Sequence, residues 1–339
     1  MKPVISTIKD IYPSSQSEAQ KQRYKNAVAA FADYFGSIGE HRFFSAPGRT
    51  EICGNHTDHN HGKVFADSVN LDVIAVVEQT DDNKIVIKSE GFPEDSIDLS
   101  DLEAVPEEKN TSASLIRGVA AGFEKHGYHI GGFRAYTTSD VMKGSGLSSS
   151  AAFEVLVGTI LSHLYNGGQV SAVKIAQISQ FAENVYFGKP SGLMDQMASS
   201  VGGMVTIDFK EKDAKVEAIA CDFAAKGYAL CVVNTGGDLP AFFDAVNRSG
   251  DSSWKLLQNV YARPTEEQMA MGIELSRRFL HGDGAQRVHG GGFAGTIQAY
   301  VPLERLADYK KLMEDAFGPG SCTALMVRPE GAVMMPMEA

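Results

Sequence analysis

The ten residues from Lys143 to Ala152 are KGSGLSSSAA, and a long apolar helical pattern follows them. Glycines let a backbone come close to a ligand and point its N–H groups at an anion. The helix that follows adds its unsatisfied N-terminal donors and the positive end of its dipole. A hydroxyl such as that of Ser150 suits Mg²⁺, the cation that accompanies a nucleotide. The stretch predicts a polyphosphate-binding loop; the alternative is an ordinary helix N-cap, because serine is a favoured capping residue.

This loop differs from the two common nucleotide-binding motifs. The motif GxxxxGK[ST] needs a lysine late in the loop, whereas Lys143 precedes the glycines. The motif GxGxxG lacks its last glycine, because Ser149 stands at that position. The neighbouring motifs must therefore identify the loop.

A second polar loop, PGRTEICGNHTDHNHG, covers residues 47–62. Arg49 offers a fixed cation, Asn55 and Asp58 offer hydrogen bonds of the kind that sugars take, and His56 can donate or accept. The alternative is a metal site, whose ligands would be His56, Asp58, His59 and His61. The order HxDHxH does not fit the HxHxDH spacing of binuclear zinc hydrolases, so the metal site is the weaker hypothesis.

Two further segments carry candidate residues. The stretch GKPSGLMDQ at 188–196 places Asp195 in a Pro/Gly turn, where an aspartate either caps a turn or serves as a base. Glu183 lies twelve positions earlier on a predicted helix, where a glutamate by itself is usually only solvated. The stretch HGGGFAGT at 289–296 holds three consecutive glycines, which indicate either a close approach to the backbone or a strand bulge.

Together these motifs resemble the small-molecule kinase superfamily of galactokinase, homoserine kinase, mevalonate kinase and phosphomevalonate kinase. The second polar loop, at residues 47–62, is similar to the galactokinase signature PGRxNxxGEHTDYNxG, and KGSGLSSSAA is similar to the family loop GGGLSSSAA. SGLMDQ is similar to GIMDQ, and GGGFAGT is similar to GGGFGGT. The matches run in family order from about Phe44 to Val301, and four ordered matches are not expected by chance.

The resemblance implies a role for each matched residue. Asp195 falls on the catalytic aspartate, and Arg49 falls on the arginine that lies close to it and to the transferred phosphoryl group. Arg49 would hold Asp195 in its ionised form and counter developing charge. The Mg²⁺ ligands would be Ser150 and Glu183. The sugar contacts would be Asn55, His56, Asp58 and the backbone of Gly192. The ATP phosphates would lie on Lys143, Gly144, Ser145, Gly146, Leu147, Ser148, Ser149 and Ser150. The supporting third motif would be Gly290, Gly291 and Gly292.

The implied activity is ATP-dependent phosphorylation of a monosaccharide at its anomeric hydroxyl, with galactose giving α-galactose 1-phosphate. The chain departs from the family pattern in two places. Asn55 stands where the signature has glutamate, which favours, as one alternative, a kinase for another sugar or small molecule of the superfamily. A helical stretch of the family, with a sugar-contacting tyrosine, is missing after Leu239, so the second lobe is expected to be truncated there. The other alternative is a non-catalytic sugar-binding regulator.

The composition and net charge of the chain indicate which classes of protein are expected and which are not. The chain has 339 residues, 43% of them hydrophobic and 22% charged, which is ordinary for a globular protein. Its formal net charge of −11 argues against a nucleic-acid binder.

The N-terminus shows no signal peptide and no run suits a membrane helix. The four cysteines are scattered and indicate free thiols in the cytoplasm. We expect the partners to be a sugar and ATP, and the protein to be a monomer or weak oligomer.

Helices and strands alternate without a βαβ rhythm, which favours an α+β fold over a doubly wound sheet. Helices are expected at residues 15–36, 112–126, 148–165, 171–187, 264–280 and 302–317. Strands are expected at residues 43–48, 73–77, 84–88, 133–137, 202–207, 229–234, within 288–301, and at 323–327. The resemblance implies two lobes with nucleotide and sugar bound between them. Residues 1–200 would form the N-terminal lobe with the sugar motif and the phosphate loop. Residues 201–339 would form the C-terminal lobe with the third glycine motif.

Overall fold

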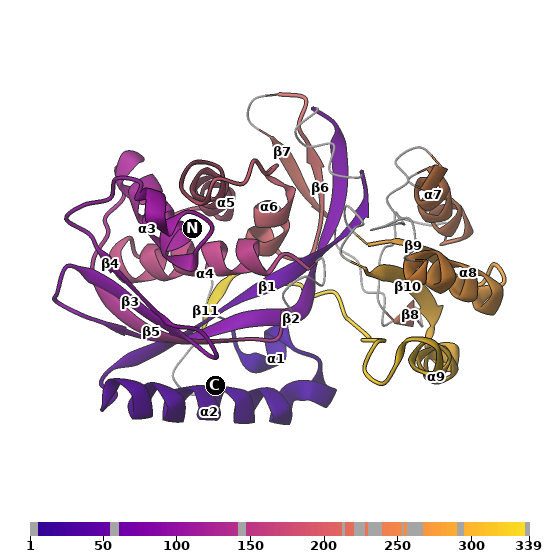
Figure 1. Cartoon of the computed structure of the whole chain (residues 1–339), viewed down its shortest axis with the longest axis horizontal. Helices are drawn as coiled ribbons and strands as arrows, with labels where there is room; N and C mark the ends of the chain where they lie inside the picture. The colour runs from indigo at the N-terminus through magenta and orange to yellow at the C-terminus, as the bar shows by residue number, and fades with distance from the viewer. Residues whose placement is uncertain are drawn as a thin grey trace.

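The structure is a computed structural model of the whole chain. It describes residues 6–54, 61–141, 147–211, 214–219, 228–229, 239–252, 254–255, 267–289 and 295–335. Within these residues a large sheet carries helices on both faces, and a smaller sheet with its own helices lies beside it (Figure 1). No helix among them combines the length and the apolar character that a membrane span requires.

The large sheet has eight strands among the described residues, in the order β11-β1-β2-β5-β3-β4, with β6 joined to β2 and β7 joined to β6. The strands are β1 (His41–Cys53), β2 (Lys63–Gln79), β3 (Lys84–Ser89), β4 (Glu94–Asp98), β5 (Phe133–Ser139), β6 (Met204–Asp208), β7 (Lys215–Ile219) and β11 (Val333–Met335). β3 and β5 are parallel and the other pairs are antiparallel. Residues 73–77 of β2 are buried on both faces, as their apolar run predicts.

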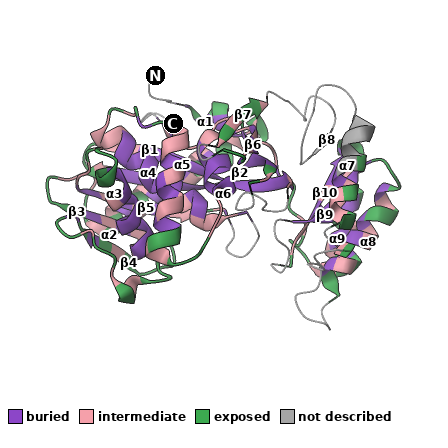
Figure 2. Cartoon of the chain, turned by 90° about the horizontal axis from the view of Figure 1, so that it is seen from above, coloured by how far each residue is buried: buried purple, intermediate pink, exposed green. Residues whose placement is uncertain are grey.

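Helices cover both faces of this sheet, and their inward sides are buried (Figure 2). One face carries α1 (Ile8–Ile11), the 3₁₀ turn η1 (Ser14–Gln16) and α2 (Ser17–Phe35). The other face carries α3 (Ser112–Lys125), α4 (Ser149–Tyr165), α5 (Ala172–Phe181), the π-helix η4 (Ala182–Phe187) and α6 (Met194–Val201), and a 3₁₀ turn, η3 (Pro106–Glu108), precedes α3. The helices predicted at 15–36, 112–126, 148–165 and 171–187 are confirmed. The placement of Asp195 in a turn is wrong, because this residue lies in the first turn of α6.

The smaller sheet has three strands among the described residues, in the order β8-β10-β9. Its elements are β8 (Tyr228–Ala229), α7 (Leu239–Ser252), α8 (Gln268–Leu280), β9 (Ala285–Val288), β10 (Ile297–Pro302), the 3₁₀ turn η7 (Leu303–Arg305) and α9 (Leu306–Phe317). The predicted helices at 264–280 and 302–317 are confirmed where the chain is described. Within the strand-like stretch 288–301, residues 297–301 belong to β10 and Val288 is the last residue of β9; β9 and β10 pair antiparallel.

The C-terminal segment returns from the smaller sheet to the large one. The strand expected at 323–327 is wrong: this stretch makes one isolated bridge, from Val327 to Val69, and the last strand is β11, which pairs with β1. The side chain of Asn70 accepts the N–H of Met326 at 2.7 Å, and the N–H of Asn70 donates to the carbonyl of Met326 at 2.9 Å. These contacts hold the segment beside β2 without continuing a ladder.

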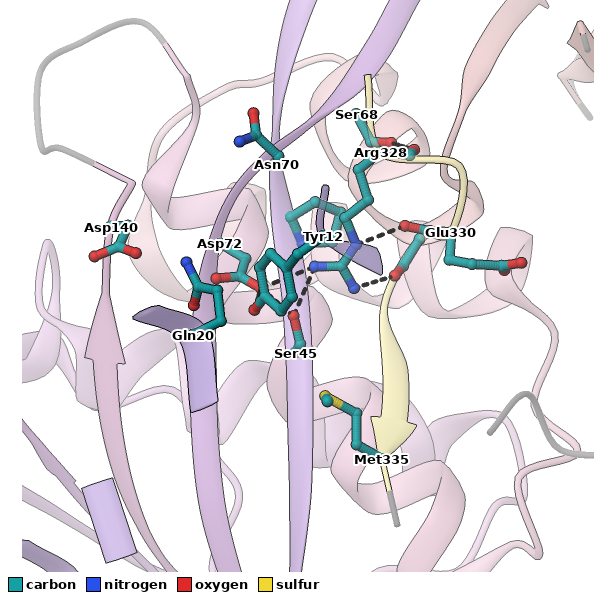
Figure 3. Close-up of polar contacts among 12 residues, drawn as sticks. Tyr12, Gln20, Ser45, Ser68, Asn70, Asp72, Asp140, Arg328, Glu330 and Met335 are labelled. Carbon is teal, nitrogen blue, oxygen red and sulfur yellow. Dashed lines mark hydrogen bonds and ion pairs between the residues drawn. The ribbon is translucent and has the colours of Figure 1, made fainter. Parts of the chain in front are cut away.

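A buried polar network anchors this returning segment (Figure 3). Arg328 is fully buried and donates to Asp72 Oδ2 at 2.9 Å and to the carbonyls of Glu330 and Gly331, both at 2.9 Å. The carboxylate of Asp72 also accepts hydrogen bonds from Arg23, Ser45 and Tyr12. β6, β7 and β11 all lie beyond residue 200 and belong to the large sheet. Sheet membership therefore does not follow a boundary at residue 200, and the assignment of 1–200 and 201–339 to two lobes stays a proposal.

Candidate active site

A buried ion pair between β1 and α6 lies at the centre of the candidate site. Arg49 Nε donates to Asp195 Oδ1 at 2.7 Å, and a terminal nitrogen of the same guanidinium donates to Oδ2 at 2.8 Å. Such bidentate pairs fix orientation as well as charge. The side chain of Arg49 is 4% exposed and that of Asp195 is 20% exposed, so the carboxylate keeps a face open to a ligand. Ser148 Oγ also donates to Asp195 Oδ2, so three hydrogen bonds orient the carboxylate.

Backbone contacts hold the elements of this pair together. A side chain at Gly48 would place its Cβ 2.9 Å from the carbonyl oxygen of Leu147, so a glycine is required for the close approach. The N–H of Arg49 donates to that same carbonyl at 3.0 Å. Ser199 Oγ, from α6, donates to the carbonyl of Pro47 at 2.6 Å. β1 is thus fixed both to the end of the glycine loop and to α6.

A second polar cluster surrounds Glu183, whose side chain is buried. Ser150 Oγ donates to Glu183 Oε1 at 3.2 Å. The amide Nε2 of Gln196 donates to Glu183 Oε2 at 2.8 Å and to Glu154 Oε2 at 3.2 Å. Glu154 is fully buried, and desolvation followed by the nearby charge of Glu183 raises its pKa well above the ordinary value. Gln196 follows Asp195 on α6, so one short helix supports both clusters.

The residues present fit a magnesium ion. A hydroxyl oxygen and a carboxylate oxygen converge at Ser150 and Glu183, and both are hard ligands of the kind that Mg²⁺ takes. No group of three or more His, Cys, Asp or Glu side chains is placed to hold a metal in the described part of the chain. Mg²⁺ is commonly bound by one or two protein ligands together with substrate phosphates, so two converging oxygens suffice.

Several predicted site residues lie outside the residues that the structure describes. These are Asn55, His56, Asp58, Lys143, Gly144, Ser145, Gly146, Gly290, Gly291 and Gly292. The rest of the glycine loop is described: Ser148 has a left-handed backbone with φ 57°, and α4 begins at Ser149. Gly192 lies just before α6, next to Ser191, whose N–H donates to Asn184 Oδ1 at 2.7 Å.

The flanks of the third glycine cluster contact β1 beside the ion pair. His289 Nε2 lies 3.0 Å from Thr50 Oγ1, and Thr50 Oγ1 donates to Gln298 Oε1 at 2.9 Å. Arg287, fully buried on β9, donates to the carbonyl of Ile52 at 2.7 Å. The smaller sheet therefore holds the strand that carries Arg49.

Sequence reasoning missed three residues of the site and one contact. Glu154 is the only charged residue in the apolar run 151–161. A single carboxylate in such a run could have been identified from the sequence as a buried polar group. Gln196 follows the predicted base directly, but nothing in the sequence showed which carboxylates its amide joins. Lys189 contacts Glu183, and Ser148, assigned to the phosphates, contacts Asp195. These contacts depend on tertiary packing.

Parts of the chain match two family models and several curated relatives. Residues 114–203 match the family model described as the GHMP kinases N terminal domain, and residues 29–79 match the galactokinase galactose-binding signature. A galactokinase of Clostridium beijerinckii is 37% identical over 210 residues, which are 60% of this chain and 52% of that relative. One of Clostridium tetani is 34% identical over 173 residues, 51% of this chain and 43% of that relative. The chain thus spans about half the length of the curated relatives it matches.

The fold is shared with solved structures of low sequence identity. Lactococcus lactis galactokinase complexed with galactose superposes with a TM-score of 0.69 at 20% identity, covering 92% of this chain and 99% of that one. Methanococcus jannaschii mevalonate kinase gives a TM-score of 0.64 at 13% identity, covering 85% of this chain and 99% of that one. This chain therefore shares the α+β fold of these solved kinases, and parts of it match the GHMP kinases N terminal domain and the galactokinase galactose-binding signature.

Proposed function

We propose that this protein is a sugar kinase that transfers the γ-phosphoryl group of ATP to the anomeric hydroxyl of a monosaccharide, with galactose as substrate and α-galactose 1-phosphate as product. The observation that carries the proposal is the bidentate Arg49–Asp195 pair beside the Ser150–Glu183 oxygens. Phosphoryl transfer needs an oriented hydroxyl, positive charge and a cation site more than covalent chemistry. The galactokinase relatives and the galactose-binding signature support the choice of sugar.

In this proposal Asp195 accepts a hydrogen bond from the sugar 1-hydroxyl and takes its proton as that oxygen bonds to the γ-phosphorus and the bond from the γ-phosphorus to the leaving ADP breaks. Arg49 and Ser148 keep the carboxylate oriented, and the guanidinium offsets negative charge as it develops. The loop from Lys143 to Ser150 would hold the phosphates of ATP at the N-terminus of α4. Asn55, His56, Asp58 and the backbone of Gly192 would bind the sugar, while Gly290, Gly291 and Gly292 would support the nucleotide side.

Ser150 and Glu183 would hold Mg²⁺, which neutralises the charge of the transferred phosphates when it is bound. Gln196 keeps Glu183 Oε2 in a hydrogen bond, so that Oε1 faces Ser150. We further propose that the protein acts in the cytoplasm, as a monomer or weak oligomer, with no nucleic-acid or membrane partner.

A coupled ADP-release assay with ATP, Mg²⁺ and galactose tests this function. Asp195→Asn keeps the shape of the side chain but removes the base, so turnover should fall by about 10²- to 10⁴-fold. Asp308→Asn is the matched control, because Asp308 also lies in the first turn of a helix but is exposed on α9. Galactose-independent ADP release, or full turnover by Asp195→Asn, would contradict the proposal.

A panel of other monosaccharides tests the specificity in the same assay. Asn55 stands where the galactokinase signature has glutamate, and this favours a different sugar as the second candidate. A sugar with far higher kcat/KM than galactose would replace galactose as the substrate and keep the kinase chemistry. Ligand binding by folded protein without any turnover would favour the regulator.

A further inference from the structure

Lys189 is held against Glu183 by the way the π-helix ends. Gly188 closes η4 with a left-handed backbone, φ 85°, which glycine adopts without a Cβ penalty. The N–H groups of Gly188 and Lys189 both donate to the carbonyl of Glu183, at 3.0 and 3.1 Å. The chain therefore turns back at Glu183, and this turn brings the Lys189 side chain into contact with the Glu183 side chain.

The ammonium of Lys189 contacts the same oxygen that faces Ser150. Lys189 Nζ lies 2.7 Å from Glu183 Oε1, and Ser150 Oγ lies 3.2 Å from that atom. Glu183 has a side chain only 2% exposed, whereas that of Lys189 is 54% exposed. An amine of a lysine side chain is ordinarily protonated at neutral pH, so the contact is an ion pair.

This contact competes with the cation site of the proposed function, on which the inference rests. A divalent ion held by Ser150 and Glu183 needs Oε1, the oxygen that the ammonium occupies. Two positive charges at one carboxylate oxygen repel each other, and the low exposure of Glu183 limits screening by water. The half-exposed lysine can leave toward solvent, while Glu183 is fixed by Gln196.

We propose that Lys189 is a resident counter-ion of Glu183 that a divalent cation must displace, so that Lys189 weakens the affinity of this protein for Mg²⁺. The ammonium of Lys189 then neutralises the carboxylate of Glu183 before the cation binds. The same ammonium favours release of the cation after turnover. A purely structural ion pair at this place would stabilise the loop but would not change cation affinity.

The test measures binding of Mn²⁺ alone, by the electron paramagnetic resonance signal of the free ion. Lys189→Met removes the ammonium and keeps the stem, so the dissociation constant for Mn²⁺ should fall by about three- to tenfold, the range expected for loss of a competing partly buried ion pair. Lys189→Gln serves as a second neutral variant. Lys215→Met is the matched control, because Lys215 also pairs with a glutamate, Glu217, but on β7, where both side chains are exposed.

Glu183→Gln separates failure of this inference from failure of the cation assignment. Weaker Mn²⁺ binding by Glu183→Gln, together with unchanged or weaker binding by both Lys189 variants, would overturn the role of Lys189 and leave the cation site in place. No effect of Glu183→Gln would overturn the cation site and with it the inference. Tighter binding by both Lys189 variants and not by Lys215→Met is the result we expect.

Discussion

Asp67 is a buried carboxyl between β1 and β6 whose titration should affect the stability of the fold. It is fully buried on β2, opposite Thr50 of β1 and Met204 of β6 in the sheet register. Neither of its carboxylate oxygens has a hydrogen-bond partner in the part of the chain that the structure describes. Burial therefore raises its pKa well above the ordinary value of 3.8. The carboxyl stays protonated in the folded protein over pH values at which it is ionised in the unfolded chain.

The sign of the pH dependence follows from proton counting. Between the unfolded and the folded pKa of Asp67, the folded state binds more protons, so this group makes the free energy of unfolding fall as pH rises. The slope is about 1.4 kcal/mol per pH unit. From pH 5 to pH 7 the loss is therefore at most about 3 kcal/mol. Asp67→Asn has a similar shape but no titration, so its stability advantage over the natural chain should grow with pH.

Urea denaturation followed by far-UV circular dichroism at pH 5, 6 and 7 measures this difference. An unchanged m-value would show that the surface exposed on unfolding is the same in both proteins. Asp98→Asn is the matched control, because Asp98 is exposed on β4 and its pKa is lowered by hydrogen bonds from Ser100. Parallel stability curves for Asp67→Asn and the natural chain would refute the account of an unpaired buried carboxyl.

Three further predictions concern His163, Arg328 and Gln196. Burial, and then the charge of Arg42, lowers the pKa of His163 to about 4. The folded state therefore binds fewer protons than the unfolded chain, and the free energy of unfolding falls as pH drops from 6.5 to 4. His163→Gln should remove part of this fall, as measured by urea titrations. Arg328→Met removes a fully buried partner of Asp72 and should lower the free energy of unfolding by about 3 kcal/mol in thermal or urea denaturation; an unchanged value would contradict the anchoring role. Gln196→Leu removes the donor shared by two carboxylates and should weaken Mn²⁺ binding or kcat by about 10- to 100-fold, with the KM for galactose unchanged.

Most helices and strands before residue 190 were predicted from the sequence, because their patterns are local. The buried run at 73–77 and the apolar stripe at 17–35 follow directly from strand and helix periodicity. The short helix α6 was missed, because eight residues after a Pro/Gly turn give little periodic signal. The strand expected at 323–327 was wrong, because hydrogen bonds to the distant Asn70 hold that stretch instead of a ladder.

The candidate site was predicted through its motifs and not through its geometry. Arg49 and Asp195 are 146 positions apart, and only the family resemblance placed them together. The contact of Lys189 with Glu183 depends on the π-helix and its glycine end, which no spacing rule predicts. The departure at Asn55 lies outside the described residues, and the panel of monosaccharides tests its effect on sugar preference.

The most direct test of the central claim is ³¹P NMR of the product formed from ATP, Mg²⁺ and galactose. The account predicts a phosphate signal coupled to the α-anomeric proton of galactose 1-phosphate with the natural chain and its loss with Asp195→Asn. Folded protein that produces no sugar 1-phosphate from galactose or any other monosaccharide, or an Asp195→Asn variant that forms it at the natural rate, would contradict the assignment of this site as a sugar kinase.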